Sequence, residues 1–393
     1  MNININQVEL KNAIEKLEKL LTKTLTTIPV INSVLLQAEN NEITITAYNL
    51  TSALILNIDG EVVTPGSILI DKSNFKLIKK LSGILNITSI DILGMINVSD
   101  EEEEEAVTSN TITIKGNRNL KFNSILPEQF PEVPKDIDSE AFCMPENAFK
   151  DKLKIKAFVA KNHFRQIFNG VLISTKNDMV ANNTYYLAKY KMNVENKCNN
   201  DMVIPVQAIE ELNKILNNKN TKELQFCYKN NDDKKPSYLK VVGKGFTYIT
   251  RLIEGIYPNY EAVIPQLFCA NINIEKRKLQ DTLEFAMEIV KDEKTKPIVF
   301  EITNQLKICT PEGMDKSMNE ILPSEITGEE TNMCFNSEYM GHILKIMSED
   351  KINIKMSGVC SPAVFIGEDN EDELYVLVPV NLKKPEQEED VAV

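Results

Sequence analysis

The feature that most constrains the fold is an internal repeat, because the same order of predicted elements occurs three times with a period of roughly 130 residues. Each copy opens with a helix whose apolar residues recur at helical spacing, at 8–23, 145–161 and 274–290. A pair of strands joined by a tight turn follows each helix, at 33–38 with 42–47, 169–174 with 178–181, and 297–302 with 305–309. A second, shorter helix comes next, at 72–81, 206–216 and 337–347. The order helix, strands, helix, strands therefore predicts an α+β fold of three tandem domains.

The predicted domain boundaries lie where similar turns close the first two copies. Phe130-Pro131 and Tyr257-Pro258 are aromatic-proline pairs that follow the last strands of those copies. The predicted domains therefore cover residues 1–137, 138–267 and 268–382. Residues 383–393 (KKPEQEEDVAV) follow as an acidic segment whose polar composition favours a flexible tail.

The last apolar stretch, residues 374–382 (LYVLVPVNL), is predicted to be a strand that is apolar on both faces. Pro379 has no backbone N–H to donate, so it belongs at a sheet edge or just past the end of the strand. Two interpretations stay open from this stretch alone. It is either a terminal strand that completes a core, or an exposed apolar lip on which another protein docks.

The charge of the chain is unevenly distributed. The net charge of −13 at first sight disfavours a partner rich in phosphates. Six acids in a row occupy residues 100–105, however, and four more lie among residues 386–390. Such blocks are typical of solvated segments, so we expect a hairpin loop at 100–105. Because the position of charges matters more than their sum, nucleic acid stays among the possible partners.

The cysteines and the apolar runs predict a cytoplasmic protein. The seven cysteines are odd in number and show no paired spacing, which is typical of free thiols in a reducing compartment. No apolar run reaches the length of about 18 residues that predicts a transmembrane helix. No signal peptide is visible at the N-terminus.

The sequence carries no motif of a catalytic or metal site. Its two histidines, His163 and His342, have no metal ligand at a suitable spacing. The motifs of serine hydrolases, phosphate-binding loops and zinc proteases are absent. The acidic run lacks the alternating ligands and the glycine of a calcium loop. The residues therefore favour a protein that is not an enzyme, and they predict no cofactor site and no metal site.

Several short strings occur in an order and spacing that characterise a known family. They are Ile28-Pro29-Val30, Phe130-Pro131, Arg165 with Asn169-Gly170, Tyr257-Pro258-Asn259-Tyr260, Phe335-Asn336-Ser337-Glu338-Tyr339, and residues 375–382. No single string is diagnostic. Together with the threefold repeat, they make residues 1–382 resemble the bacterial sliding clamps, the beta subunits of DNA polymerase III.

The resemblance implies a ring of six domains, formed by two identical chains joined head to tail. Helices would line the hole, sheets would form the outer wall, and duplex DNA would pass through without being read in sequence. Such a ring is a processivity factor that has no catalysis of its own. Polymerases, the clamp loader and repair proteins would dock short linear motifs in a pocket near the C-terminus. The alternative is a divergent clamp-like scaffold that binds proteins without encircling DNA.

A ring that slides needs cations aimed at phosphates and no contacts with base edges. Lysines recur at helical spacing on predicted helices of several copies, and the resemblance implies that they face the DNA. The DNA-facing candidates are Lys23, Lys72, Lys76, Lys79, Lys150, Lys154, Lys161, Arg165, Lys214 and Lys345.

The resemblance also implies a mostly apolar pocket for partner peptides. Its candidate residues are Tyr185, Tyr186, Leu187, Pro258, Val263, Tyr339, Pro362, Val378, Pro379, Val380 and Leu382. Tyr185 and Tyr186 stand where the family has a His or Ser and then an Arg, which keeps surface for stacking but removes a cation. The segment 383–393 extends beyond the usual end of the family and could reach the pocket.

The subunit interface that the resemblance implies joins the first predicted domain of one chain to the third of the other. Leu120 and Phe122, on the strand that closes the first domain, match one side of it. Ile289 and Val290, on the first helix of the third domain, match the other side. Two-fold symmetry would use this contact twice in the ring.

Overall fold

The computed structural model describes residues 1–21, 28–99, 102–217 and 219–381, and the chain divides into two compact units. The first unit combines Met1–Leu153 with Val194–Glu254, and the second combines Lys154–Asn193 with Gly255–Val393. Lys23, Leu382 and the predicted tail at 383–393 lie outside the described residues.

The α-helices follow the order that the repeat predicts. Within the described residues they are α1 (Gln7–Leu17), α2 (Phe75–Ile78), α3 (Glu146–Lys152), α4 (Val206–Ile215), α5 (Lys276–Val290) and α6 (Ser337–Ile346). None of these helices is long and apolar enough to cross a membrane. The predictions for α4, α5 and α6 are correct to within about two residues at each end, as is usual for helix boundaries.

Three predicted helices are shorter than expected. The helix predicted at 8–23 is α1, which ends at Leu17. The helix predicted at 72–81 begins as a 3₁₀ turn, Lys72–Asn74, and α2 adds little more than one turn. The helix predicted at 145–161 is α3 followed by a 3₁₀ segment, Leu153–Phe158. Leu153 and Ile155 are both fully buried, whereas a continuous α-helix would place them on nearly opposite faces.

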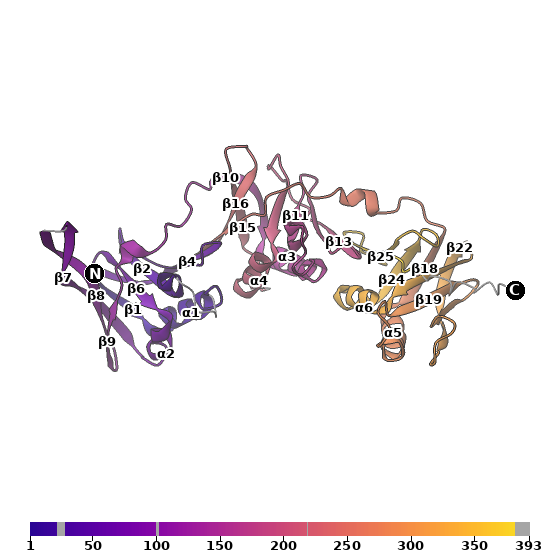
Figure 1. The fold of residues 1–393 in the computed structure, drawn as a ribbon, viewed down its shortest axis with the longest axis horizontal. Helices are drawn as coiled ribbons and strands as arrows, with labels where there is room; N and C mark the ends of the chain where they lie inside the picture. The colour runs from indigo at the N-terminus through magenta and orange to yellow at the C-terminus, as the bar shows by residue number, and fades with distance from the viewer. Residues whose placement is uncertain (22–27, 100–101, 218, 382–393) are drawn as a thin grey trace, which may run out of the picture. The chain divides into compact units, whose positions relative to one another are not determined.

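The first unit contains two antiparallel sheets (Figure 1). One has the order β5-β1-β7-β8-β9, with bounds Gly60–Thr64, Asn2–Asn6, Ile84–Ser99, Glu102–Lys115 and Asn119–Ser124. The other has the order β10-β15-β16-β17-β4-β3-β2-β6, with bounds Ser139–Pro145, Glu223–Asn230, Pro236–Gly243, Phe246–Arg251, Ser52–Ile58, Glu42–Tyr48, Ser33–Glu39 and Gly66–Asp71. β14 (Met202–Pro205) leads into α4. The predicted hairpin at 33–38 and 42–47 is confirmed as β2 and β3, and both turn residues, Asn40 and Asn41, have the positive φ of a two-residue hairpin loop.

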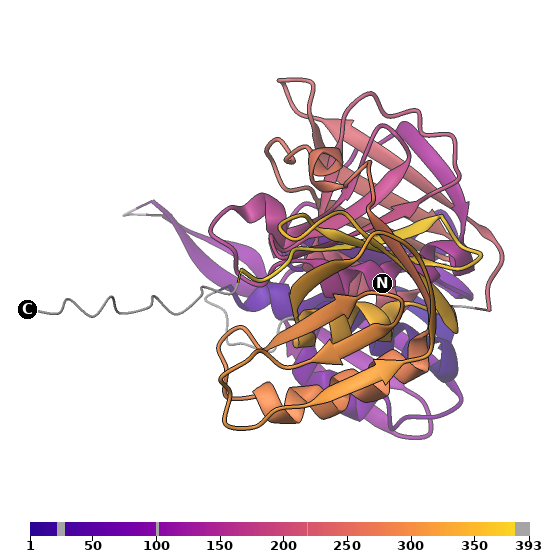
Figure 2. The same cartoon turned by 90° about the vertical axis from the view of Figure 1, so that its right-hand side faces the viewer.

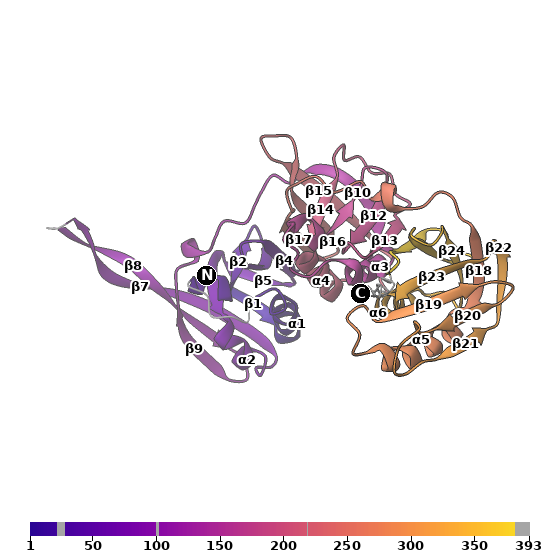
Figure 3. The same cartoon turned by 45° about the vertical axis from the view of Figure 1, so that its right-hand side comes forward.

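The loop predicted at 100–105 is mostly strand. β7 and β8 form a long ribbon that projects from the rest of its sheet (Figure 3), and the glutamates from Glu102 to Glu105 lie within β8. Asp100 and Glu101 lie outside the described residues. Backbone pairing in a ribbon does not depend on apolar side chains. A prediction based only on the run of like charges therefore ends the strand too early.

The second unit also contains two antiparallel sheets (Figure 2). The larger one includes, in order, β11-β12-β13-β26-β25-β24-β18-β22, with bounds Gly170–Ile173, Asp178–Asn182, Tyr186–Lys191, Glu373–Leu377, Ala363–Gly367, Lys351–Met356, Ala270–Glu275 and Ser324–Gly328. The smaller one has the order β21-β20-β19-β23, with bounds Asn319–Leu322, Leu306–Cys309, Pro297–Ile302 and Thr331–Asn336. α5 and α6 pack against each other and against strands of these sheets. The predicted pairs β11–β12 and β19–β20 are both confirmed.

Sheets run across the predicted domain boundaries without interruption. β4, from the first predicted domain, pairs with β17, from the second, along the register that sets Leu54 opposite Tyr248. β13, from the second, pairs with β26, from the third, with Leu187 opposite Val376. The division into three domains at 137 and 267 therefore stays a proposal based on the repeated order of elements.

A buried polar cluster ties β4, β17 and α4 together in the first unit. The Tyr248 hydroxyl on β17 lies 2.7 Å from Oε2 of Glu211 and 3.1 Å from Oγ of Ser52. Gln207 donates a further hydrogen bond to Glu211 over 3.2 Å. Burial raises the pKa of Glu211, and the hydrogen bond from Tyr248 opposes that shift. The Tyr248 hydroxyl is therefore the main support of a carboxyl group that is almost without contact with water.

We expect Tyr248→Phe to lower the free energy of unfolding by about 1–3 kcal/mol, because it leaves a buried carboxyl group without its main donor. Urea denaturation followed by circular dichroism measures the change. Tyr238→Phe, on the neighbouring strand at a half-buried position, is the matched control and should change stability little. Equal unfolding curves for Tyr248→Phe and the wild type would contradict the importance of the cluster.

Candidate functional site

Three tyrosines that were predicted from the sequence line one cavity in the second unit. Tyr185, Tyr186 and Tyr339 form part of the wall of a space of about 700 Å³, which we call the tyrosine cavity. The Tyr339 ring centroid lies 5.4 Å from that of Tyr185 and 5.1 Å from that of Tyr186. Phe158 packs edge-on against Tyr186, with ring centroids 5.3 Å apart. Offset aromatic rings at these distances stabilise one another and offer a rigid surface for stacking.

The turn between β12 and β13 is built to present Tyr185. The Asn182 side chain accepts a hydrogen bond from the Thr184 N–H over 2.7 Å, and the Asn183 side chain accepts from the N–H groups of Tyr185 and Tyr186 over 3.1 and 3.0 Å. Thr184 has a φ of +77°, a strained conformation that these bonds hold in place. As a result Tyr185 is 56% exposed whereas Tyr186 is 7% exposed, and burial raises the pKa of Tyr186.

The N-terminus of α6 fixes the third tyrosine. The Asn336 side chain caps this helix by accepting from the Tyr339 N–H over 3.0 Å. The neighbouring Glu338 pairs with Lys296 at 2.6 Å, which lowers the pKa of the Glu338 carboxyl. The cap places the Tyr339 ring at the first turn of α6, facing the β12–β13 turn.

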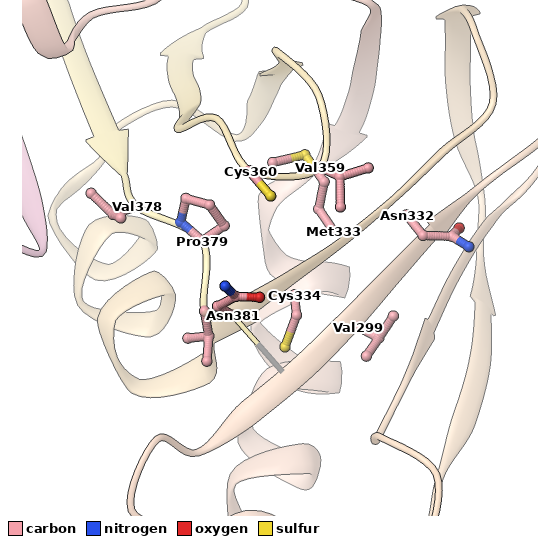
Figure 4. Close-up of a pocket in the computed structure, with 10 residues that line it drawn as sticks. Val299, Asn332, Met333, Cys334, Val359, Cys360, Val378, Pro379 and Asn381 are labelled. Carbon is pink, nitrogen blue, oxygen red and sulfur yellow. The ribbon is translucent and has the colours of Figure 1, made fainter. Parts of the chain in front are cut away.

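A second, smaller cavity of about 320 Å³ lies beside the last described segment of the chain (Figure 4). Val378, Pro379 and Val380 line it together with Cys334, Val359 and Cys360, and we call it the C-terminal cavity. Six of the predicted pocket residues therefore line cavities of the second unit, three in each.

The segment between the two cavities is held by backbone hydrogen bonds. The N–H of Val378 donates to the Tyr185 carbonyl over 3.0 Å, and the N–H of Val380 donates to the Cys334 carbonyl over 2.8 Å. β26 ends at Leu377, so Pro379 lies just past the strand, which was one of its two predicted places. Leu377 is buried in the sheet, as in a terminal strand that completes a core, and Val378 is 42% exposed. Docking of another protein on this stretch stays a prediction.

The other predicted pocket residues line neither of these two cavities. Leu187 is buried in β13, where it serves the core. Pro258 is half-buried and Val263 exposed in the segment between β17 and β18, and Pro362 is half-buried before β25. Their roles in a pocket stay predictions, as does that of Leu382.

The sequence analysis missed the basic side of the tyrosine cavity. Lys156 from the 3₁₀ segment, His163 from the following loop and His342 from α6 line it together with the predicted Lys161 and Lys345. The histidines were weighed only as metal ligands, and nothing in their spacing indicates that three separate elements meet here. Within the described residues no cluster of His, Cys, Asp and Glu could hold a metal, and all seven cysteines carry free thiols.

The DNA-facing candidates fall into two groups. Lys76, Lys161, Arg165, Lys214 and Lys345 are exposed, and Lys72 is half-buried. Exposed ammonium and guanidinium groups of this kind are suited to contacts with phosphates.

Three of the predicted DNA-facing lysines are engaged inside the protein. Lys79 lies 2.8 Å from Glu18, and Lys154 lies 2.8 Å from Glu373. Lys150 donates to the carbonyls of Asn213, over 2.8 Å, and Leu216, at the C-terminal end of α4. The charges of these three already have partners within the fold, so their contact with DNA stays a prediction that these contacts do not support.

The predicted interface residues differ in exposure. Leu120 and Phe122 are half-buried on β9, which is an edge strand of its sheet. Ile289 is half-buried on α5, whereas Val290 is completely buried and serves the core of the second unit, so its place in an interface stays a prediction that the burial does not support. Phe285, one turn before Ile289, is 62% exposed and was missed. Phe285 lies four residues before Ile289, so the helical spacing alone places the two large apolar side chains on the same face of α5.

The comparisons with known proteins agree with this geometry. A family model described as DNA polymerase III beta subunit, central domain, matches residues 144–259, and the model of the C-terminal domain of the same subunit matches residues 261–381. The beta sliding clamps of Staphylococcus epidermidis and Halalkalibacterium halodurans are 22% and 24% identical over 90% of this chain and 93% of their own.

Solved structures show the same fold. The sliding clamp of Bacillus subtilis superposes with a TM-score of 0.82 at 19% identity, over 98% of this chain and 100% of that one. The DNA polymerase III subunit beta of Pseudomonas aeruginosa also gives 0.82, at 20% identity, over 97% of this chain and 100% of that one. Because the two family models together cover more than half of the sequence, the chain belongs to the family of bacterial DNA polymerase III beta subunits, the beta sliding clamps.

Proposed function

We propose that this protein is a processivity factor, a ring that encircles duplex DNA without reading its sequence and tethers DNA polymerases to it. The observation that carries the proposal is the match to beta-subunit domains from residue 144 to residue 381, together with clamp folds that cover nearly the whole chain. Two chains joined head to tail would form the ring. The chain would supply no catalysis and would need no cofactor.

The exposed cations support a contact with DNA that is independent of sequence. Lys76, Lys161, Arg165, Lys214 and Lys345 are long side chains with terminal charges, which neutralise phosphates without fixing a position on the bases. A sliding ring needs such weak, equivalent contacts. In the proposed ring these side chains face the hole.

The two cavities of the second unit support docking of partner peptides. The tyrosine cavity offers flat aromatic surface, and the C-terminal cavity offers apolar surface around Val378 and Pro379. Peptide-binding sites commonly combine apolar anchors with a few polar guides. We propose that clamp loader, polymerases and repair proteins share this region.

The sheet edges and α5 support the proposed dimer. β9 is paired on one side only, and β21 is the corresponding edge of the smaller sheet in the second unit. α5 packs against β21, so the exposed Phe285 and the half-buried Ile289 belong to the same region of the unit as that edge. Edge strands that stay unpaired in a monomer are natural places for pairing between chains.

The alternative is a clamp-like scaffold that binds proteins as a monomer and does not encircle DNA. The tyrosines at Tyr185 and Tyr186 motivate it, because they replace a cation of the usual pocket. Light scattering coupled to gel filtration separates the two proposals. A mass of 44.5 kDa at micromolar concentration favours the scaffold, and twice that mass favours the ring.

We expect the pair Phe285→Asp and Ile289→Asp to convert the dimer into a monomer, because burying two carboxylates in an apolar contact is costly. The mass measured by light scattering should fall to 44.5 kDa. Ile256→Asp is the control, because Ile256 is 89% exposed and lies in the segment between β17 and β18. A dimer that survives the α5 substitutions at micromolar concentration would contradict the proposed interface.

We expect Tyr185→Ala to weaken partner docking about 5- to 30-fold, the loss expected when an exposed aromatic anchor is removed. The probe is a labelled peptide with the clamp-binding motif of the polymerase from the same organism, followed by fluorescence anisotropy. In primer extension on circular single-stranded DNA, the wild type should lengthen the products of that polymerase, and Tyr185→Ala should require correspondingly more protein.

Val63→Ala is the matched control for this test, since Val63 is 54% exposed on β5 of the first unit. It should leave both the peptide affinity and the product length unchanged. Wild-type affinity in Tyr185→Ala would remove the tyrosine cavity from the proposed docking region.

A further inference from the structure

We propose that the tyrosine cavity binds the acidic segment 383–393 of its own chain, and that this intramolecular contact competes with partner peptides. The competition rests on the proposed function, whereas the contact itself does not. Three observations support it: the charge of the cavity, the place where the segment leaves the fold, and the sequence of the segment.

The cavity has a one-sided charge. Lys156, Lys161 and Lys345 line it, with His163 and His342 beside them, and no carboxylate is found among the described residues of its wall. Lys161 and Lys345 are exposed, and no ion pair in the described part of the chain engages any of the three lysines. A concave surface of one sign concentrates ligands of the opposite sign.

The last described residues lie close to this cavity. Val378 donates a backbone hydrogen bond to the carbonyl of Tyr185, a residue of the cavity wall. Asn381, the last described residue, follows three positions later, so its Cα lies within about 11 Å of the Val378 Cα. The twelve residues after Asn381 can span up to about 40 Å when extended. The distance to the cavity therefore does not limit the contact.

The chemistry of the segment complements the wall. Glu386, Glu388, Glu389 and Asp390 supply four carboxylates within five positions. Each ammonium–carboxylate contact at an exposed site is weak and sensitive to salt. Attachment to the same chain, however, gives the segment an effective concentration on the order of millimolar, so a weak contact is enough to occupy the cavity.

The intramolecular contact would lower the apparent affinity of partner peptides for the cavity. A peptide that enters the tyrosine cavity must displace the segment, so peptides with their own acidic or aromatic residues would compete best. Partners that use only the C-terminal cavity around Pro379 would be less affected.

The test uses the full chain and a labelled peptide with the sequence of residues 383–393. The receptor is the variant E386Q/E388Q/E389Q/D390N, whose own segment has lost its carboxylates. We expect fluorescence anisotropy to show that this variant binds the peptide about tenfold more tightly than the wild type, in which the cavity is already occupied. Raising the salt concentration should weaken the binding, and a peptide with the same four amide substitutions should not bind.

A second variant locates the binding site. K161Q/K345Q, added to the amide variant, should lower the affinity for the peptide about tenfold, whereas K316Q/K351Q, at two other exposed lysines of the second unit, should not. Equal binding by the wild type and the amide variant would overturn the proposal, as would an affinity that K161Q/K345Q leaves unchanged. If the weaker peptide binding of the wild type disappeared when the protein was diluted, the cavity would be occupied by the segment of a second copy. That result would overturn the intramolecular contact. None of these measurements involves DNA or a polymerase. A negative result would therefore exclude the intramolecular contact without bearing on the proposed function.

Discussion

The pairing of β13 with β26 is the interaction on which the candidate site depends. It sets Leu187 opposite Val376 and joins a strand from the middle of the sequence to the last strand of the described chain. Because the two strands are antiparallel, the start of β13 lies beside the end of β26, and Tyr185 is hydrogen-bonded to Val378. This pairing therefore positions Tyr185 in one cavity and Val378 in the other.

The polar contacts around this pairing explain why several lysines have structural roles. Lys154 pairs with Glu373 at the start of β26, and the Tyr375 hydroxyl donates to the same carboxylate over 2.8 Å. The Tyr190 hydroxyl lies 3.1 Å from that of Tyr375, inside the sheet. Buried hydroxyl and carboxylate groups need such partners, so the half-buried Lys154 has a partner that the sequence does not reveal. The exposed candidates are Lys76, Lys161, Arg165, Lys214 and Lys345, and their contact with DNA stays a proposal.

The sequence analysis predicted the elements well and their assembly less well. Apolar periodicity and Asn-containing turns located α4, α5, α6 and the hairpin β2–β3, because those signals are local. The continuous sheets across residues 137 and 267 depend on pairing between distant strands, which no local pattern encodes. For the same reason the basic wall of the tyrosine cavity was missed, and Val290 was placed on a surface although its side chain fills the core. The resemblance to a family pointed to Tyr185, Tyr186 and Tyr339, which line one cavity, and to Val378 and Val380, which line another.

The central claim is that two copies of this chain close around duplex DNA, and topology tests it most directly. The protein is loaded on a nicked circular plasmid by the clamp loader of the same organism, purified by gel filtration at moderate salt, and the plasmid is then cut once. A ring that slides stays with the circle, because only non-specific contacts act on the DNA, and leaves the linear molecule through its ends. We predict retention before the cut and loss after it. Equal retention on circular and linear DNA, or none on either, would contradict the account.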